Sequence, residues 1–76
     1  MPRYENLEGD STITHYKIGP DRIKVRFSDG SVYEYSYDSA GRENIEHMKQ
    51  LARDGEGLQS FINRNVRFDY ESKRRP

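Results

Sequence analysis

One β-hairpin, predicted over residues 23–35, constrains the fold of this chain more than any other feature. Apolar side chains occupy every second position of its first half, and basic side chains fall between them. This period of two, carried by β-branched and aromatic residues, predicts a strand with one buried face and one face in solvent. Tyrosines alternate in the same way after the turn. The alternating residues are Ile23, Val25 and Phe27, with Arg22, Lys24 and Arg26 between them, followed by Tyr33, Tyr35 and Tyr37.

Two turns are compatible with this hairpin, and they set different registers. A two-residue turn at Asp29-Gly30 places Lys24 opposite Tyr35, so the tyrosines share a face with the basic residues. A three-residue loop over residues 28–30, with its glycine in the left-handed conformation, places Lys24 opposite Glu34. A slip of one residue turns every side chain to the other face, and only the three-residue loop gathers the apolar residues on one side. We therefore predict that odd-numbered side chains of the hairpin face inward and even-numbered ones face solvent.

A third strand is predicted before the hairpin. Residues 11–18 have strand composition, but their apolar positions do not alternate cleanly unless a β-bulge lies near Thr14-His15. Gly19-Pro20-Asp21 predicts a turn, because proline presets the first corner and aspartate can bond its own backbone. The three strands then form an antiparallel meander. Residues 1–10 are polar and aperiodic, and we expect them to be a flexible lead-in.

Two helices and a short strand are predicted after the meander. Apolar residues recur at helical spacing over residues 42–54, and Gly55 supplies a left-handed stop. A shorter helix follows Gly57, and alternating apolar residues over 66–70 predict a fourth strand or an extended docking segment. The helices carry the only apolar stripes long enough to cover the meander. We therefore predict an α+β fold of order β-β-β-α-α-β, with both helices on one face of a small curved sheet.

Composition predicts a single small domain with a thin core. The chain has 76 residues, of which 32% are hydrophobic and 34% charged, and much of the apolar set is aromatic. The absence of cysteine excludes disulfides and thiolate metal sites. The longest apolar run is two residues, which predicts no membrane span or signal peptide and a cytoplasmic setting.

A spaced set of residues resembles a known family. The set consists of Ser11, Ile13, Tyr16 and Ile18, then Ile23, Val25, Phe27, Gly30, Tyr33 and Tyr35, then Gly57, Leu58, Ser60, Phe61, Ile62, Asn63, Val66 and Arg67. In this pattern the chain resembles the KTSC domain, which occurs at the C-terminus of some lysyl-tRNA synthetases and alone in bacterial and phage proteins. The resemblance implies one domain over residues 11–70, and the charge of the last residues predicts a basic tail over 71–76. The resemblance also implies a domain without established activity, for which RNA binding has been suggested.

Four of the matching residues mark either the fold or a binding site. The predicted register turns two of them, Tyr33 and Tyr35, toward the core, which favours a role in the fold. Phe61 lies on the apolar side of the second helix. We expect the Asn63 side chain to bond backbone at the helix exit, so that Asn63→Ala costs about 1 kcal/mol of stability.

No residue set indicates catalysis. His15 and His47 lie on different predicted elements, and neither has a second ligand at metal-binding spacing. The serines lack the context of a nucleophile elbow or a Ser-x-x-Lys motif. Gly55-x-Gly57 has no phosphate-binding lysine after it. We predict a domain that is not an enzyme and that holds no metal or cofactor.

Basic residues nevertheless gather in two places. The formal net charge is zero, with 13 basic and 13 acidic residues, so overall charge does not drive binding to nucleic acid. Residues 64–76 hold five basic and two acidic residues, a net charge of +3. Arg22, Lys24 and Arg26 recur on the solvent face of their strand about 6–7 Å apart, a spacing that suits phosphates along a single strand.

Two functions remain open. The first is an RNA- or nucleic-acid-binding module, and its alternative interpretation is that Glu34 neutralises Lys24 and the other charges form a solvated face. The second is a protein-interaction module or homo-oligomer using a sheet edge or an aromatic rim, including an accessory protein of a phage or prophage. The nucleic-acid hypothesis assigns contacts to Arg22, Lys24, Arg26, Arg64, Arg67, Lys73, Arg74 and Arg75.

Overall fold

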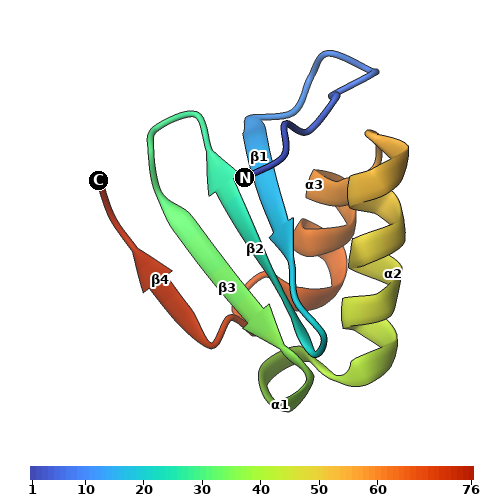
Figure 1. Ribbon diagram of the computed structural model, residues 1–76, viewed down its shortest axis with the longest axis vertical. Helices are drawn as coiled ribbons and strands as arrows, with labels where there is room; N and C mark the ends of the chain where they lie inside the picture. Colours follow the sequence, from blue (N-terminus) through green and yellow to red (C-terminus); the bar gives the residue numbers. More distant parts are fainter.

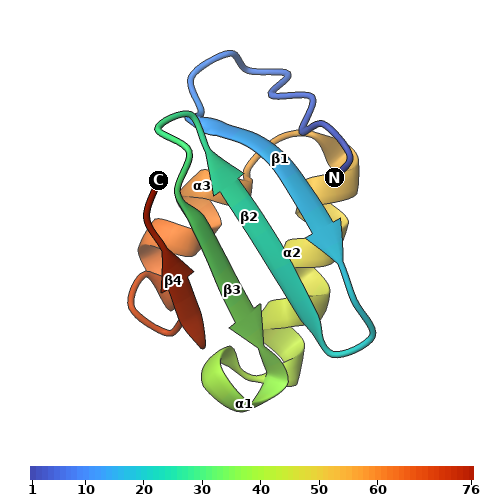
Figure 2. The same ribbon diagram turned by 60° about the vertical axis from the view of Figure 1, so that its left-hand side comes forward.

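The computed structural model describes residues 1–76 and has the predicted α+β architecture. Its elements are β1 Ile13–Ile18, β2 Arg22–Phe27, β3 Val32–Ser36, α1 Tyr37–Ala40, α2 Arg42–Asp54, α3 Leu58–Phe61, the π-helical η1 Ile62–Val66 and β4 Ser72–Arg74. The four strands form one antiparallel sheet in the order β1-β2-β3-β4. Figure 1 shows helices α2 and α3 on one side of the sheet, and Figure 2 shows them behind it, so the other face is uncovered.

The hairpin has the three-residue loop and the predicted register. Gly30 has φ +90°, a left-handed conformation that favours glycine, and the Phe27 N–H donates to the Ser31 carbonyl at 2.9 Å. Ile23 lies opposite Tyr35, and Lys24 lies opposite Glu34. The inward-facing side chains Ile23, Val25 and Tyr35 are fully buried, and Phe27 and Tyr33 are partly buried against them. The predicted alternation is confirmed, as is the bulge in β1, where the register shifts between Ile13 and His15.

The core lies between the inner face of the sheet and the helices. Helix α2 has the predicted bounds, and Gly55, with φ +77°, ends it and donates its N–H to the Leu51 carbonyl at 3.0 Å. No helix combines the length and apolar composition needed to cross a bilayer. The buried residues from the helical side are Ala40, Ile45, Met48, Ala52, Leu58, Ile62 and Val66.

The chain after β3 contains a helical turn that the sequence analysis did not predict. In α1 the Ser36 hydroxyl accepts from the Ser39 N–H at 3.2 Å, and the Ser36 N–H donates to the Ser39 hydroxyl at 3.0 Å. This reciprocal capping box satisfies donors that a short helix otherwise leaves unpaired. It turns the chain from the edge of the sheet toward α2.

The predicted strand over residues 66–70 is wrong, because the second helix continues through η1 and β4 lies at Ser72–Arg74. Leu58, Ile62 and Val66 are spaced by four residues and are all buried, which is the pattern of one helical face. This spacing outweighs the alternation that begins at Val66. The fourth strand is formed instead by part of the expected basic tail, which pairs with β3.

The expected flexible lead-in is packed onto the domain. Tyr4 is only 3% exposed, and its hydroxyl accepts a hydrogen bond at 3.3 Å from the Leu58 N–H, a donor at the start of α3. Burial raises the pKa of the Tyr4 hydroxyl. The Tyr4 N–H donates to the Thr14 carbonyl, and the Tyr16 N–H donates to the Pro2 carbonyl. Residues 2–4 therefore pair along the free edge of β1, as Figure 2 shows for the N-terminal segment.

We predict that Tyr4→Ala lowers the free energy of unfolding by about 3 kcal/mol, because it opens a cavity and removes the partner of the Leu58 N–H. Urea denaturation followed by circular dichroism measures the change. Leu7→Ala is the matched control, since Leu7 is 61% exposed in the same segment and should change stability by less than about 0.5 kcal/mol. Equal effects of the two substitutions would contradict the packing of the lead-in.

Candidate nucleic-acid interface

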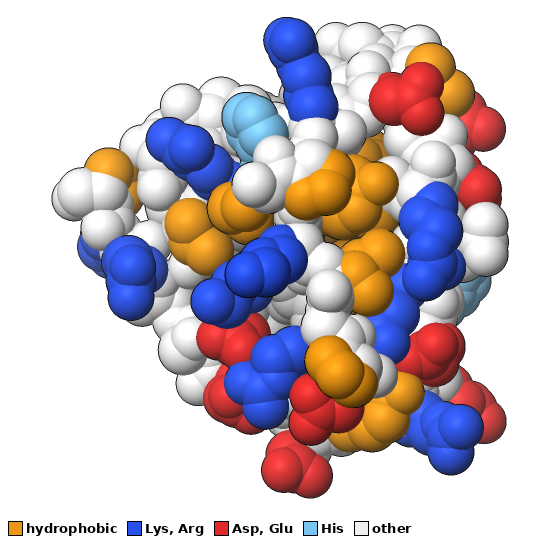
Figure 3. All heavy atoms as spheres, viewed as in Figure 1, with side chains coloured by type: hydrophobic (Ala, Val, Ile, Leu, Met, Phe, Trp, Pro, Cys, Tyr) orange, Lys and Arg blue, Asp and Glu red, His pale blue; other side chains and the backbone are white.

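The sheet concentrates positive charge in a chain that is neutral overall. The four strands hold six basic residues and one acidic residue, Glu34, a net charge of +5. Figure 3 shows Lys and Arg side chains spread over the region that the strands occupy in Figure 1. Most acidic residues lie in the N-terminal segment and around helices α1 and α2. The six basic residues are Lys17, Arg22, Lys24, Arg26, Lys73 and Arg74.

Register places four of these cations on the uncovered face of the sheet. Residues directly opposite each other on antiparallel strands project to the same side. Lys17 lies opposite Lys24, and both Arg26 and Arg74 lie opposite Val32. These even positions of β2 face away from the helices, because Ile23 and Val25 face the core. We call this surface, formed by Lys17, Lys24, Arg26 and Arg74, the outer face.

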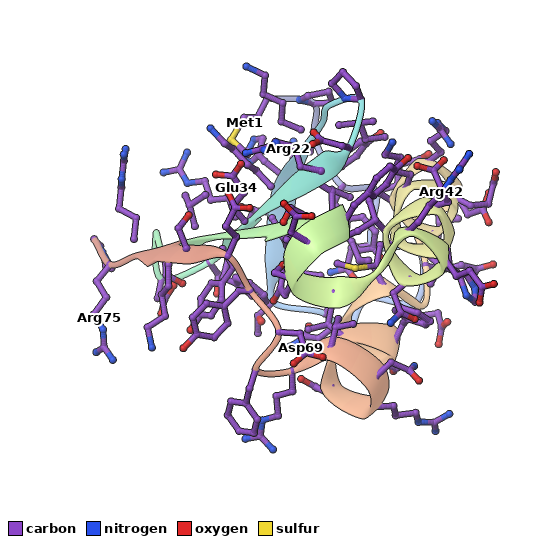
Figure 4. All side chains as sticks on the ribbon, turned by 90° about the horizontal axis from the view of Figure 1, so that it is seen from below. Met1, Arg22, Glu34, Arg42, Asp69 and Arg75 are labelled. Carbon is purple, nitrogen blue, oxygen red and sulfur yellow. The ribbon has the colours of Figure 1, made fainter.

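Arg22 is held by carboxylates on three sides. Its Nη1 lies 2.6 Å from Glu34 Oε2 and 3.3 Å from Glu71 Oε2, and its Nε lies 3.1 Å from Asp21 Oδ1. Figure 4 shows Arg22 and Glu34 close to each other. Hydrogen bonds to Asp21 and then Glu34 raise the pKa of Arg22. Because these carboxylates already compensate its charge, we leave Arg22 out of the surface defined above, and its contact with phosphate stays a prediction.

The same arrangement leaves Lys24 without an ionic partner. Lys24 and Glu34 are opposite each other as predicted, but the Glu34 carboxylate bonds Arg22 on the diagonal. Lys24 and Glu34 therefore form no ion pair, the contact on which the alternative interpretation depended. Lys17 faces Lys24 instead, and like charges in this position oppose strand pairing. None of the four cations of the outer face lies in an ion pair, so their charge does not serve the fold.

A second surface lies where the inner face of the sheet extends beyond the helices. It is a groove of about 430 Å³ between β3, β4 and η1 with the segment that follows it. Phe27 and Tyr70 both meet the Tyr33 ring edge to face, with centroids 5.4 and 5.2 Å from it. Lys73 Nζ lies 5.7 Å from the Tyr33 centroid and 5.6 Å from the Tyr70 centroid. We call this surface, lined by Phe27, Tyr33, Asn63, Phe68, Tyr70 and Lys73, the aromatic groove.

The four residues that mark the family resemblance separate into two groups. Tyr35 is 1% exposed, and burial raises the pKa of its hydroxyl, so it serves the core. Phe61 is partly buried, and its ring centroid lies 4.5 Å from the centroid of the His47 ring. Tyr33 and Asn63 line the aromatic groove. The predicted register favoured a role in the fold for both tyrosines, whereas Tyr33 both packs against the core and lines the groove.

Asn63 does not make the hydrogen bond expected of it. Its side chain is exposed and has no hydrogen-bond partner in the protein, whereas Asn65 Nδ2 donates to the Phe61 carbonyl at 3.2 Å. The reason is that the helix does not end at Asn63 but continues through η1, so no free backbone group lies beside it.

The remaining predicted cations are dispersed. The Arg67 guanidinium lies 5.2 Å from the Phe68 ring and borders the aromatic groove, together with Lys73. Arg74 reaches the outer face, and Arg75 follows β4. Arg64 is exposed on η1 and lines neither surface.

Four residues of these surfaces were not predicted as site residues. They are Lys17, Phe27, Phe68 and Tyr70. Lys17 could have been found from the turn at residues 19–21. This turn places Ile18 opposite Ile23 and therefore Lys17 opposite Lys24. Phe68 and Tyr70 gave no such signal, because their position at the groove depends on the path of the chain after η1.

No known protein family, curated protein or solved structure that was compared with this chain matches it. The resemblance to the KTSC domain therefore stays a prediction, and the two surfaces carry the functional argument.

We predict that Asn63→Ala changes the free energy of unfolding by less than about 0.5 kcal/mol, because an exposed side chain without a partner in the protein contributes little. Thermal or urea denaturation measures the change. A loss near 1 kcal/mol would instead show that Asn63 supports the helix. Asn65→Ala, which removes an exposed hydrogen bond from the same turn, shows how large such an effect is here.

Proposed function

We propose that this domain is a non-catalytic module that binds single-stranded RNA through the outer face. The observation that carries the proposal is the charge of the strands, +5 in a chain of zero net charge, with none of the four outer-face cations in an ion pair. Cations that are left unpaired on one surface attract a polyanion and release its counterions. The resemblance to the KTSC domain adds support from outside the structure.

The spacing of the cations suits a phosphate backbone. Lys24 and Arg26 are separated by about 6–7 Å along β2, and Lys17 lies about 5 Å from Lys24 across the strand pair. Arg74 lies two strands from Arg26, about 10 Å away. Lysine and arginine side chains at these positions reach successive phosphates of an extended strand. Such contacts supply affinity without reading sequence.

The edges of the sheet favour nucleic acid over self-association by strand pairing. Residues 2–4 cover the edge of β1. At the other edge, β4 has only three residues, all exposed, and carries Lys73 and Arg74. Short, charged edge strands oppose pairing between sheets. The same features leave the charged face accessible to an extended polyanion.

We predict that the triple variant Lys24→Gln, Arg26→Gln, Arg74→Gln binds a short single-stranded RNA more weakly and with a smaller salt dependence. Loss of three phosphate contacts lowers the slope of log Kd against log salt by about 2. Fluorescence anisotropy with labelled RNA, measured between low and moderate salt, gives both quantities. Glutamine keeps side-chain length while it removes charge.

The matched control is Arg42→Gln, Arg53→Gln, Arg64→Gln, which removes the same charge from the helical side. It should keep the wild-type slope, and it also tests the assignment of Arg64. Equal weakening of both variants would show that only overall charge matters, and undetectable binding by the wild type would refute the proposal. A wild-type dimer, seen by light scattering and dissociated by the triple variant, would favour the protein-interaction function instead.

A further inference from the structure

The aromatic groove offers chemistry that the outer face lacks. The outer face presents its cations with one imidazole, that of His15 opposite Arg26, whereas the groove combines three neighbouring phenyl and phenol rings with the cations Lys73 and Arg67. We propose that the aromatic groove receives one unpaired base of the bound strand, with a flanking phosphate beside Lys73 and Arg67. This inference rests on the proposed function and assigns a second, separate part of the contact.

Stacking is supported by the rings that remain open to solvent. Phe68 is 76% exposed, the largest exposure among the exposed large apolar residues, and it stands at the groove beside Arg67. Tyr33 and Tyr70 meet edge to face, with an interplanar angle of 88°, and both rings line the groove beside Lys73. Bases stack on aromatic side chains of single-strand-binding proteins regardless of their identity. The volume of about 430 Å³ lies within the range of small-ligand sites.

The polar groups of the groove suit a base with its phosphate, and they determine at which end of the groove the phosphate lies. Asn63 carries a free amide, whose donor and acceptor can pair with the edge of a base. Asp29 also lines the groove, but its carboxylate already accepts from the Ser31 N–H and hydroxyl, at 2.9 and 2.6 Å. These bonds lower the pKa of Asp29 and keep it charged, which repels a phosphate. The phosphate therefore lies toward Lys73 and Arg67, neither of which is paired with a carboxylate.

Strand β4 connects the two surfaces. Lys73 lies opposite Tyr33 and faces the groove, whereas the next residue, Arg74, lies opposite Val32 and faces outward. All three residues of β4 are exposed, and nothing covers its outer edge. In Figures 1 and 2, β4 forms the edge of the sheet farthest from β1. A nucleic-acid strand that crosses this edge can keep a phosphate at Arg74 and place the next base in the groove.

The test uses two RNA hexamers that differ by one base. One consists entirely of stable abasic residues, and the other carries a single 2-aminopurine, a base whose fluorescence falls when it stacks. We expect the full-length protein to bind the second hexamer about 10-fold more tightly and to quench its fluorescence. The double variant Asn63→Ala, Phe68→Leu should reduce the difference to less than about 2-fold. Its affinity for the abasic hexamer should not change.

Controls separate this proposal from the one on which it rests. Asn65→Ala, two residues from Asn63 and outside the groove, should keep the full difference between the hexamers. Equal affinity of the wild type for both hexamers, without quenching, overturns the groove site and leaves phosphate binding intact. Failure to bind either hexamer overturns both proposals. A dimer that Phe68→Leu dissociates, seen by light scattering, also overturns the groove site, because the rings would then serve self-contact.

Discussion

The register of the β2–β3 hairpin is the constraint on which every other feature depends. Gly30, with φ +90°, closes a three-residue loop and so decides which side chains face the helices. A shift of one residue would expose Tyr35, now 1% exposed, and turn Lys24 toward the core. The same shift would remove Tyr33 from the aromatic groove. One backbone geometry thus keeps the aromatic and cationic surfaces on opposite sides of a sheet only four strands wide.

The ion pairs of the sheet gather at Arg22, the first residue of β2, and the cations of the outer face stay unpaired. Arg22 joins the turn before β2, strand β3 and the segment before β4 through Asp21, Glu34 and Glu71. Its side chain is about two-fifths exposed, so each pair contributes little to stability, and the pair with Glu71 is the one that reaches the C-terminal segment. Because Glu34 is engaged there, Lys24 has no carboxylate within ion-pair distance. The fold and the candidate interface therefore depend on the same carboxylate.

The parts of the structure that could be predicted from sequence are those whose cause is local. Period-two alternation gave the hairpin register, and helical spacing with Gly55 gave the bounds of α2. Tyr4 could not be placed, because its partner, the Leu58 N–H, lies 54 residues away. The segment after Ile62 carried two conflicting periods, and the burial of Val66 decided for the helix. The outer face could be predicted largely from the register. The ion pairs that occupy Arg22, and the aromatic groove, could not be predicted, because both depend on contacts between segments distant in sequence.

Stability and binding are coupled in a domain whose core is this thin. The aromatic groove is a continuation of the core, since buried Tyr35 and Ile62 line it together with Tyr33. Tyr33 stacks on Tyr35 with centroids 6.5 Å apart, so its ring is held in place before any ligand arrives. A ring fixed by packing loses little conformational freedom when a base stacks on it, which favours binding. Substitutions at Tyr33 must therefore affect folding and binding together, whereas those at the rim, such as Phe68, separate the two.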